Sequence, residues 1–186
     1  MIKPRDIFYP ELRAVNDFYA ADEGLQRPGG MIIGRDETPT ADIEALGAWG
    51  FDLAAGRTVE QVRQAIRQSD EWQSKHPGED PGVVPPPLHS PPFLPPRGHF
   101  YDELSQVNVF YGTSDGLQRP GGMVIDVNGV QTADIEALGA WGYDLLTGRA
   151  VDEIKKAIKH SHEWAIKHPG QDPGPPPEPW PPVPPP

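Results

Sequence analysis

The chain contains two copies of one sequence segment, and this duplication constrains the fold more than any other feature. Residues 8–82 match residues 100–174 without a gap, at a constant offset of 92 residues, and most aligned positions are identical. Each copy offers roughly 75 residues, near the lower size at which a domain can bury a core of its own. Two copies are too few for a solenoid, whose repeats need stacked neighbours. We therefore expect either two similar small domains or one pseudo-symmetric pair that packs together.

Apolar residues recur at steps of three and four in three segments of each copy, which predicts three helices. In the first copy we expect one helix over residues 10–21, a second from an N-cap at Thr40 to a stop at Gly56, and a third over residues 58–76. The segment between the first two is rich in Gly and Pro, and it predicts an ordered loop with room for a short strand over residues 31–33. The expected fold class is mainly α: two tandem three-helix modules with ordered Gly/Pro loops.

Proline-rich segments join and follow the two copies. The chain has 25 prolines, well above average usage, and most of them lie in two blocks. Such runs favour the stiff, extended polyproline II conformation. We therefore divide the chain into an N-terminal extension (1–7), helical repeats (8–82 and 100–174), a linker (83–99) and a C-terminal arm (175–186).

The proline-rich segments have two interpretations. They are solvated spacers, or they are arms that dock along another subunit. Docking is supported by four apolar residues that a pure spacer does not need: Phe93, Leu94, Trp180 and Val183. A proline-rich arm loses little conformational entropy on binding, which suits an extended contact.

The most unusual repeated segment is Leu-Gln-Arg-Pro-Gly-Gly-Met, at residues 25–31 and 117–123. One interpretation is a structural turn whose arginine pairs locally. The other is a recognition loop that is used twice, in which Arg27 and Arg119 bind a partner while Met31 and Met123 add an adaptable contact surface. Because core residues can drift among Ile, Leu and Val, unchanged loops favour two equivalent binding elements or one strict backbone geometry.

The first copy also carries a spaced pattern made of Gly34, Arg35, Trp49, Gly56, Ser69 and Glu71. This pattern resembles a bacterial helical domain of unknown function, found in surface-layer and haemolysin-like secreted proteins and similar to the helical part of phycobilisome linker polypeptides. The resemblance covers residues 34–72 and 126–164, although the second copy has Asp126-Val127 where Gly-Arg is expected. It implies a helical interaction module and brings no catalytic residues.

No residue constellation in the sequence points to catalysis, a cofactor or a metal. Asp42 and Glu44 are better placed as helix N-terminal charges than as an acid–base pair. Residues 126–129 resemble the start of a calcium loop, but the later ligands are mis-spaced. His76 and His168 are expected as helix C-caps. We find no Ser-His-Asp set and no phosphate loop, so we expect a non-enzymatic protein without a cofactor.

Composition limits the partners. The net charge of −11 disfavours binding to nucleic acid, and the absence of cysteine rules out disulfides and thiolate metal sites. The N-terminal sequence shows no basic region followed by an apolar run, and no stretch is long enough to span a membrane, so we expect neither a secretory signal nor a membrane partner. Four tryptophans have two interpretations, core residues or sugar-stacking platforms: Trp49, Trp72, Trp141 and Trp164.

Together these features predict a structural or assembly protein that bridges equivalent sites on a larger particle, with other protein subunits as partners. We expect the setting to be a bacteriophage virion, where the chain would act as a decoration, cement or connector protein. The alternative is a secreted or cell-surface module that recognises a glycan or a surface protein.

Overall fold

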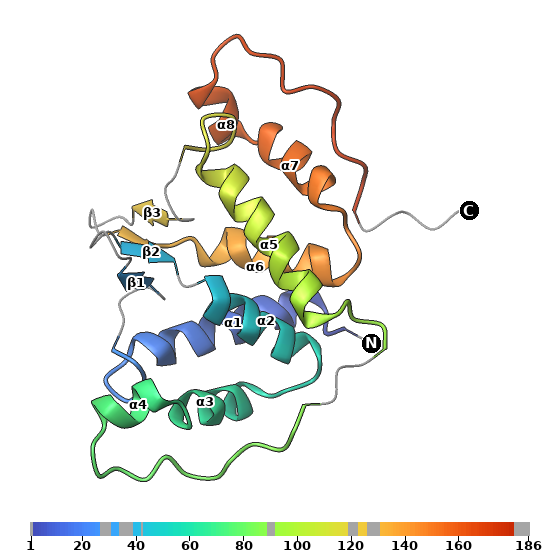
Figure 1. Cartoon of the computed structure of the whole chain (residues 1–186). Helices are drawn as coiled ribbons and strands as arrows, with labels where there is room; N and C mark the ends of the chain where they lie inside the picture. The colour runs from blue at the N-terminus through green and yellow to red at the C-terminus, as the bar shows by residue number, and fades with distance from the viewer. Residues whose placement is uncertain are drawn as a thin grey trace.

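A computed structural model describes residues 2–26, 31–33, 39–41, 43–88, 92–118, 123–125 and 131–180. Over these residues the chain is mainly helical, as the sequence predicts, and both halves repeat the same order of elements (Figure 1). The first half (residues 2–88) contains α1 (Arg5–Ala20), β1 (Met31–Ile33), β2 (Pro39–Ala41), α2 (Ile43–Ala54), α3 (Val59–Arg67) and α4 (Asp70–Lys75). The second half (residues 92–180) contains α5 (Arg97–Gly112), β3 (Met123–Ile125), β4 (Gln131–Ala133), α6 (Ile135–Leu146), α7 (Val151–Lys159) and α8 (His162–Lys167).

The first helix begins earlier than predicted. α1 starts at Arg5, and Pro10, which the sequence placed at the helix start, lies inside it. Pro10 has no N–H to donate to the Asp6 carbonyl, so one helical hydrogen bond is missing. The turns before Pro10 form nonetheless, because Phe8 is fully buried and Arg5 pairs with a carboxylate of the other half.

The second helix begins later than predicted, so the N-cap at Thr40 is wrong. Thr40 lies in β2, where it pairs with Ile32 of β1 in an antiparallel hairpin. Residues 31–33, for which the sequence allowed a short strand within the loop, form β1. In the second half the N-cap of α6 is Asp134, whose Oδ1 accepts a hydrogen bond from the Ala137 N–H at 3.1 Å.

The third predicted helix is two helices, α3 and α4, because the helix is interrupted at residues 68–69. Thr58 and Gln61 form a capping box at the start of α3. Ser69 is the N-cap of α4, and its Oγ accepts a hydrogen bond from the Trp72 N–H at 3.2 Å. Ser69 thus provides a hydrogen-bond acceptor for a free N–H group at the start of α4. The change of direction between α3 and α4 places Trp72 in the core, where it is almost fully buried.

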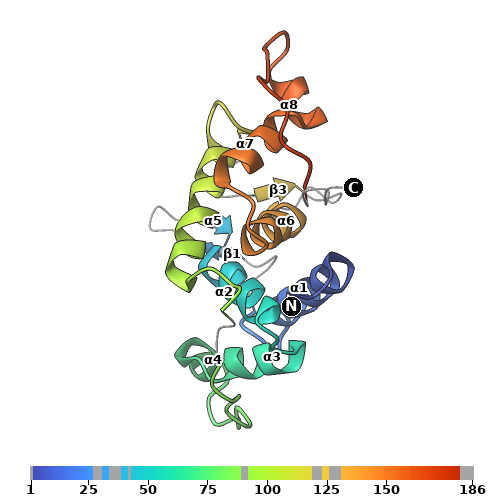
Figure 2. The same ribbon diagram turned by 90° about the vertical axis from the view of Figure 1, so that its right-hand side faces the viewer.

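The two halves pack together as a pseudo-symmetric pair. α2 packs against α6 at the centre, α1 of the first half packs against α6, and α5 of the second half packs against α2 (Figures 1 and 2). The ring centroids of Phe8 and Tyr143 lie 5.3 Å apart, and those of Phe51 and Phe100 lie 5.9 Å apart. These two ring contacts between the halves are related by an offset of 92 residues, as in a twofold interface between identical subunits. One continuous core joins both halves.

Two glycines allow the crossing helices to approach each other. A Cβ on Gly47 of α2 would lie 3.2 Å from Leu104 of α5, and a Cβ on Gly139 of α6 would lie 3.0 Å from Leu12 of α1. Both distances are tighter than ordinary van der Waals contact, so a larger residue would push the helices apart. This packing gives a structural reason for the unchanged repetition of residues 40–50 as residues 132–142.

A buried carboxylate links the halves on each side of the pseudo-symmetric axis. Asp144 accepts hydrogen bonds from Arg149 of its own half at 2.8 Å and from Arg5 of the first half. Asp52 is held in the same way by Arg57 at 3.0 Å and by Arg97 of the second half.

We expect Asp144→Asn to lower the free energy of unfolding by about 2 kcal/mol. The amide keeps the shape of the side chain but loses the charge that both guanidinium groups need, and hydrogen bonds to charged groups contribute about 1.5–3 kcal/mol. Urea unfolding followed by circular dichroism measures the change. Asp152→Asn, on the exposed surface of α7, is the control and should change the unfolding free energy by less than about 0.5 kcal/mol. Equal effects of the two variants would contradict a structural role for the Asp144 pair.

Candidate functional site

The start of each Leu-Gln-Arg-Pro-Gly-Gly-Met segment is held by its own half. Three side chains from α4 and its C-cap bind the loop backbone: Trp72 Nε1 donates to the Glu23 carbonyl at 2.8 Å, Lys75 donates to the Leu25 carbonyl, and His76 Nε2 lies 2.8 Å from the Gly24 carbonyl oxygen. The same contacts recur from Trp164, Lys167 and His168. Gln26 and Gln118 both adopt the left-handed conformation, with φ of 55° and 56°. Residues 24–26 are thus repeated unchanged for a structural reason, a strict backbone geometry.

His76 and His168 occupy the C-cap positions of α4 and α8, as the sequence predicts. Each imidazole stacks on the tryptophan four residues earlier, with ring centroids 4.4 Å apart for Trp72 and 4.3 Å apart for Trp164. These histidines join the end of a helix to the loop and have a structural role.

The remainder of each repeated loop leads into a hairpin. Arg27 and Arg119 lie outside the described residues, while Met31 and Met123 are the first residues of β1 and β3. β1 pairs with β2, β3 pairs with β4, and β2 contacts β4. The two hairpins consequently lie side by side at one end of the molecule (Figure 1).

The four apolar residues of the proline-rich segments have different environments. Leu94 is 8% exposed and belongs to the core, so most of its surface packs within the chain itself. Phe93 beside it is 48% exposed. Trp180 donates a hydrogen bond from Nε1 to Thr147 Oγ1 at 3.2 Å. Val183 lies outside the described residues.

Where they are described, both proline-rich segments lie along their own half. Arg57 donates a hydrogen bond to the Pro86 carbonyl at 3.2 Å, and Gln68 donates one to the Gly82 carbonyl at 3.0 Å. In the second half Glu153 accepts a hydrogen bond from the Glu178 N–H at 2.7 Å. That bond and one from Lys156 hold the pKa of the Glu153 carboxyl below its ordinary value, with the Lys156 bond as the larger cause. These parts of the segments are therefore held on the protein itself.

All four repeated tryptophans are buried, as the core interpretation predicts. Trp49 and Trp141 make edge contacts with tyrosines at centroid distances of 4.8 Å, and they are 6% and 7% exposed. Trp72 and Trp164 are more deeply buried. A sugar-stacking platform needs an exposed indole face, so no described observation favours a glycan as the ligand.

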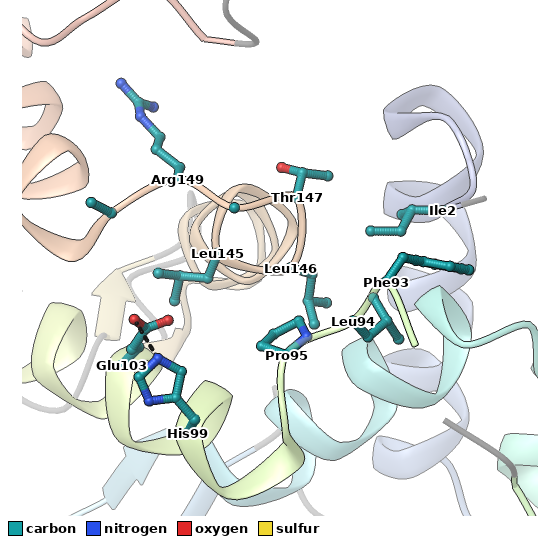
Figure 3. Close-up of a pocket in the computed structure, with 12 residues that line it drawn as sticks. Ile2, Phe93, Leu94, Pro95, His99, Glu103, Leu145, Leu146, Thr147 and Arg149 are labelled. Carbon is teal, nitrogen blue, oxygen red and sulfur yellow. Dashed lines mark ion pairs between the residues drawn. The ribbon is translucent and has the colours of Figure 1, made fainter. Parts of the chain in front are cut away.

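A surface pocket of about 780 Å³ lies where the two halves meet, and it was not predicted from the sequence. It lies beside the C-terminal end of α6 and is walled by apolar residues from both halves, among them Ile2, Leu94 and Leu146 (Figure 3). Two polar side chains of α5 also line it: His99 Nε2 lies 3.0 Å from Glu103 Oε1. The sequence difference related to this pocket is that Pro95 stands where the first half has Lys3. Both residues lie outside the matched segments 8–82 and 100–174.

In addition to this pocket, two equivalent grooves lie between helices of different halves. The groove between α1 and α6 has a volume of about 220 Å³, and in it Arg13 pairs with Glu136 at 2.7 Å. The equivalent groove between α2 and α5 has a volume of about 740 Å³, and there Ser105 replaces the arginine beside Glu44. Burial raises the pKa of the Tyr101 phenol in this groove, against the opposing effect of Arg97. At this position the second half has Ser105, whereas the first half has the cation Arg13.

The fold and these sites define a mainly helical, internally twofold protein with paired hairpins at one end and a largely apolar pocket between its halves. Comparisons with protein-family models, curated proteins and solved structures find no match to the chain. The resemblance to the bacterial helical domain stays a prediction. Across the described part of the chain, no helix is both long and apolar enough to cross a membrane. Within those same residues, no three His, Asp or Glu side chains gather as a metal site would require.

Proposed function

We propose that this chain is a non-enzymatic assembly protein that binds two equivalent, closely spaced sites on a larger particle through its paired hairpins. The observation that supports this function is the contact between β2 and β4, which brings equivalent hairpins of the two halves together at one end of the molecule. The proposed setting is a bacteriophage virion, in which the chain acts as a decoration, cement or connector protein and contacts other protein subunits.

The packing of the two halves changes how such a bridge would work. Two separate domains joined by a stiff linker would reach distant sites. Two halves that share one core instead hold their hairpins at a fixed, short separation. A fixed separation avoids the entropy loss of ordering a linker on binding. It also raises the effective concentration of the second hairpin once the first has bound. Such bivalent binding can exceed the affinity of a single site by roughly 10²–10⁴-fold. The chain is therefore suited to neighbouring, symmetry-related sites.

The test uses Arg27→Ala, Arg119→Ala and the double variant, since these arginines lead into the two hairpins. Particles released by cultures of the organism that encodes the chain are separated on a density gradient. They are then incubated with each purified full-length variant and sedimented again. We expect the original chain to sediment with the particles. Each single variant should bind on the order of 100-fold more weakly through loss of bivalent binding, and the double variant should not bind.

The matched control is Lys155→Ala, which removes one positive charge from a partly exposed position of α7, away from the hairpins. It should sediment with the particles like the original chain. Circular dichroism confirms that each variant is folded. The proposal fails if the original chain remains at the top of the gradient, or if the double variant binds as well as the control.

A further inference from the structure

In the first half, a lysine of the chain itself occupies a defined ammonium site. Lys3 lies in the segment before α1, and its Nζ donates hydrogen bonds to Glu11 Oε2 at 2.8 Å and to the Arg57 carbonyl oxygen at 2.9 Å. A carboxylate from α1 and a backbone carbonyl just after α2 thus hold the ammonium group between them.

In the second half, the acceptors of this site are retained and the cation is lost. Glu103 is equivalent to Glu11, Arg149 is equivalent to Arg57, and Pro95 replaces Lys3. The Glu103 side chain is 22% exposed and that of Glu11 is 25% exposed, so the two carboxylates have similar burial. Both Glu103 and Arg149 line the pocket of about 780 Å³ at the junction of the halves (Figure 3).

The geometry points to a binding site for a primary ammonium group in this pocket, and we propose that its occupant is a lysine side chain of a partner polypeptide. The ammonium donates to the Glu103 carboxylate and to the Arg149 carbonyl, as Lys3 does to their equivalents. The lysine source is favoured over a small free amine because the occupant of the equivalent site is itself a polypeptide lysine that enters from an extended segment.

The walls and charges of the pocket suit this occupant. Ile2, Leu94 and Leu146 offer apolar surface for the methylene chain of a lysine, which buries its stem while its charged end is paired. The Arg149 guanidinium does not exclude a second cation, because it is bound to Asp144, just as Arg57 is bound to Asp52 beside Lys3. The net charge of −11 also attracts a cationic partner.

Among the residues that the structure describes, His99 competes for Glu103 in the second half. It stands where the first half has Ile7, and its Nε2 lies 3.0 Å from the carboxylate. An incoming ammonium must displace this contact. We therefore expect His99→Ile, which restores the residue of the first half, to strengthen lysine binding several-fold.

The test is an NMR titration of the ¹⁵N-labelled full-length chain with Nα-acetyl-lysine methylamide. The matched probe is the norleucine derivative, which has the same methylene chain without the ammonium. We expect saturable shifts at Glu103 and at residues 146–150 with the lysine derivative, and none with the norleucine derivative. Equal shifts with both probes would overturn the proposal.

Four variants use the internal duplication as a control. Glu103→Gln and Pro95→Lys should each abolish the shifts, the first by removing the acceptor charge and the second by filling the site from within. Glu11→Gln should leave binding in the second half unchanged, because its own site is served by Lys3. Lys3→Ala should open a second, equivalent site, with new shifts at Glu11 and at residues 54–58.

The spectrum of each unliganded variant shows whether it is folded, and His99→Ile gives a second folded variant with the opposite expected effect. Retained binding in folded Glu103→Gln would overturn the proposal. If n-butylammonium bound more tightly than the lysine derivative, the assignment to a polypeptide lysine would be wrong. The pocket and the hairpins lie at opposite ends of α6, a 12-residue helix about 18 Å long. The lysine site and the proposed binding through the hairpins can therefore fail independently of each other.

Discussion

Replacing Phe100 by alanine is expected to lower the free energy of unfolding by about 3–5 kcal/mol. Phe100 of α5 is fully buried, and it contacts both halves: its ring lies against Gly142 of its own half and 5.9 Å, between centroids, from Phe51 of the first half. Alanine leaves a cavity that neither half can fill, because helices fix both walls. Urea unfolding followed by circular dichroism measures the loss.

A matched control separates this effect from a general loss of apolar surface. Ile166 of α8 is 65% exposed, so Ile166→Ala should change the unfolding free energy by no more than about 0.5 kcal/mol. The Phe100 variant should also weaken both halves together, since they share one core. Unfolding that begins in the second half while the first half keeps its full stability would contradict the shared core.

The second large effect is expected at Gly24, where alanine should cost about 3 kcal/mol or more. A Cβ at this position would lie 1.9 Å from the Phe18 carbonyl oxygen, which belongs to the backbone of α1 and cannot move aside as a flexible side chain can. The same clash exists at Gly116, at 2.0 Å from the Phe110 carbonyl oxygen. Thermal or urea unfolding of Gly24→Ala and Gly116→Ala should show losses of similar size.

Gly98 provides a control of opposite sign. It lies in the first turn of α5, and a Cβ there would meet no atom within 4 Å. Because alanine is favoured over glycine in helices by roughly 0.5–1 kcal/mol, Gly98→Ala should be neutral or stabilising. If Gly24→Ala were as stable as Gly98→Ala, the close packing of the loop on α1 would be wrong.

The sequence predicted the helical class and the two copies, but not how the copies pack on each other. Apolar periodicity shows which face of a helix is buried, and it does not show what covers that face. The buried face of α1, which carries Phe8 and Leu12, could have closed a core within its own copy. In the structure it packs on α2 and α3 of its own half, and it also reaches α6 of the other half, where Arg5 pairs with Asp144.

Helix ends were missed where local structure overrode a continuous apolar pattern. The steps from Ile66 to Trp72 run through Ser69 without interruption, so the sequence favoured one helix across the break. The pattern did not reveal that Trp72 turns inward to bind the Glu23 carbonyl, since this contact joins segments 49 residues apart. Thr40 was misplaced because it pairs with Ile32 in a local hairpin, which helical periodicity does not reveal.

The proposed ammonium site follows from contacts in the structure and not from the sequence. Its acceptors are a carboxylate, Glu103, and a backbone carbonyl, and a carbonyl leaves no signature in the residue sequence. The replacement of Lys3 by Pro95 is visible in an extended alignment, but it gains meaning only from the contacts that Lys3 makes.

The most direct test of the twofold packing is a set of nuclear Overhauser effects between the halves. In the full-length chain the packing predicts cross-peaks between the rings of Phe8 and Tyr143, and between those of Phe51 and Phe100, whose centroids lie 5.3 and 5.9 Å apart. The Tyr19–Trp49 pair within the first half, at 4.8 Å, is the internal reference. A spectrum that shows the reference cross-peak but neither pair between the halves would contradict the account.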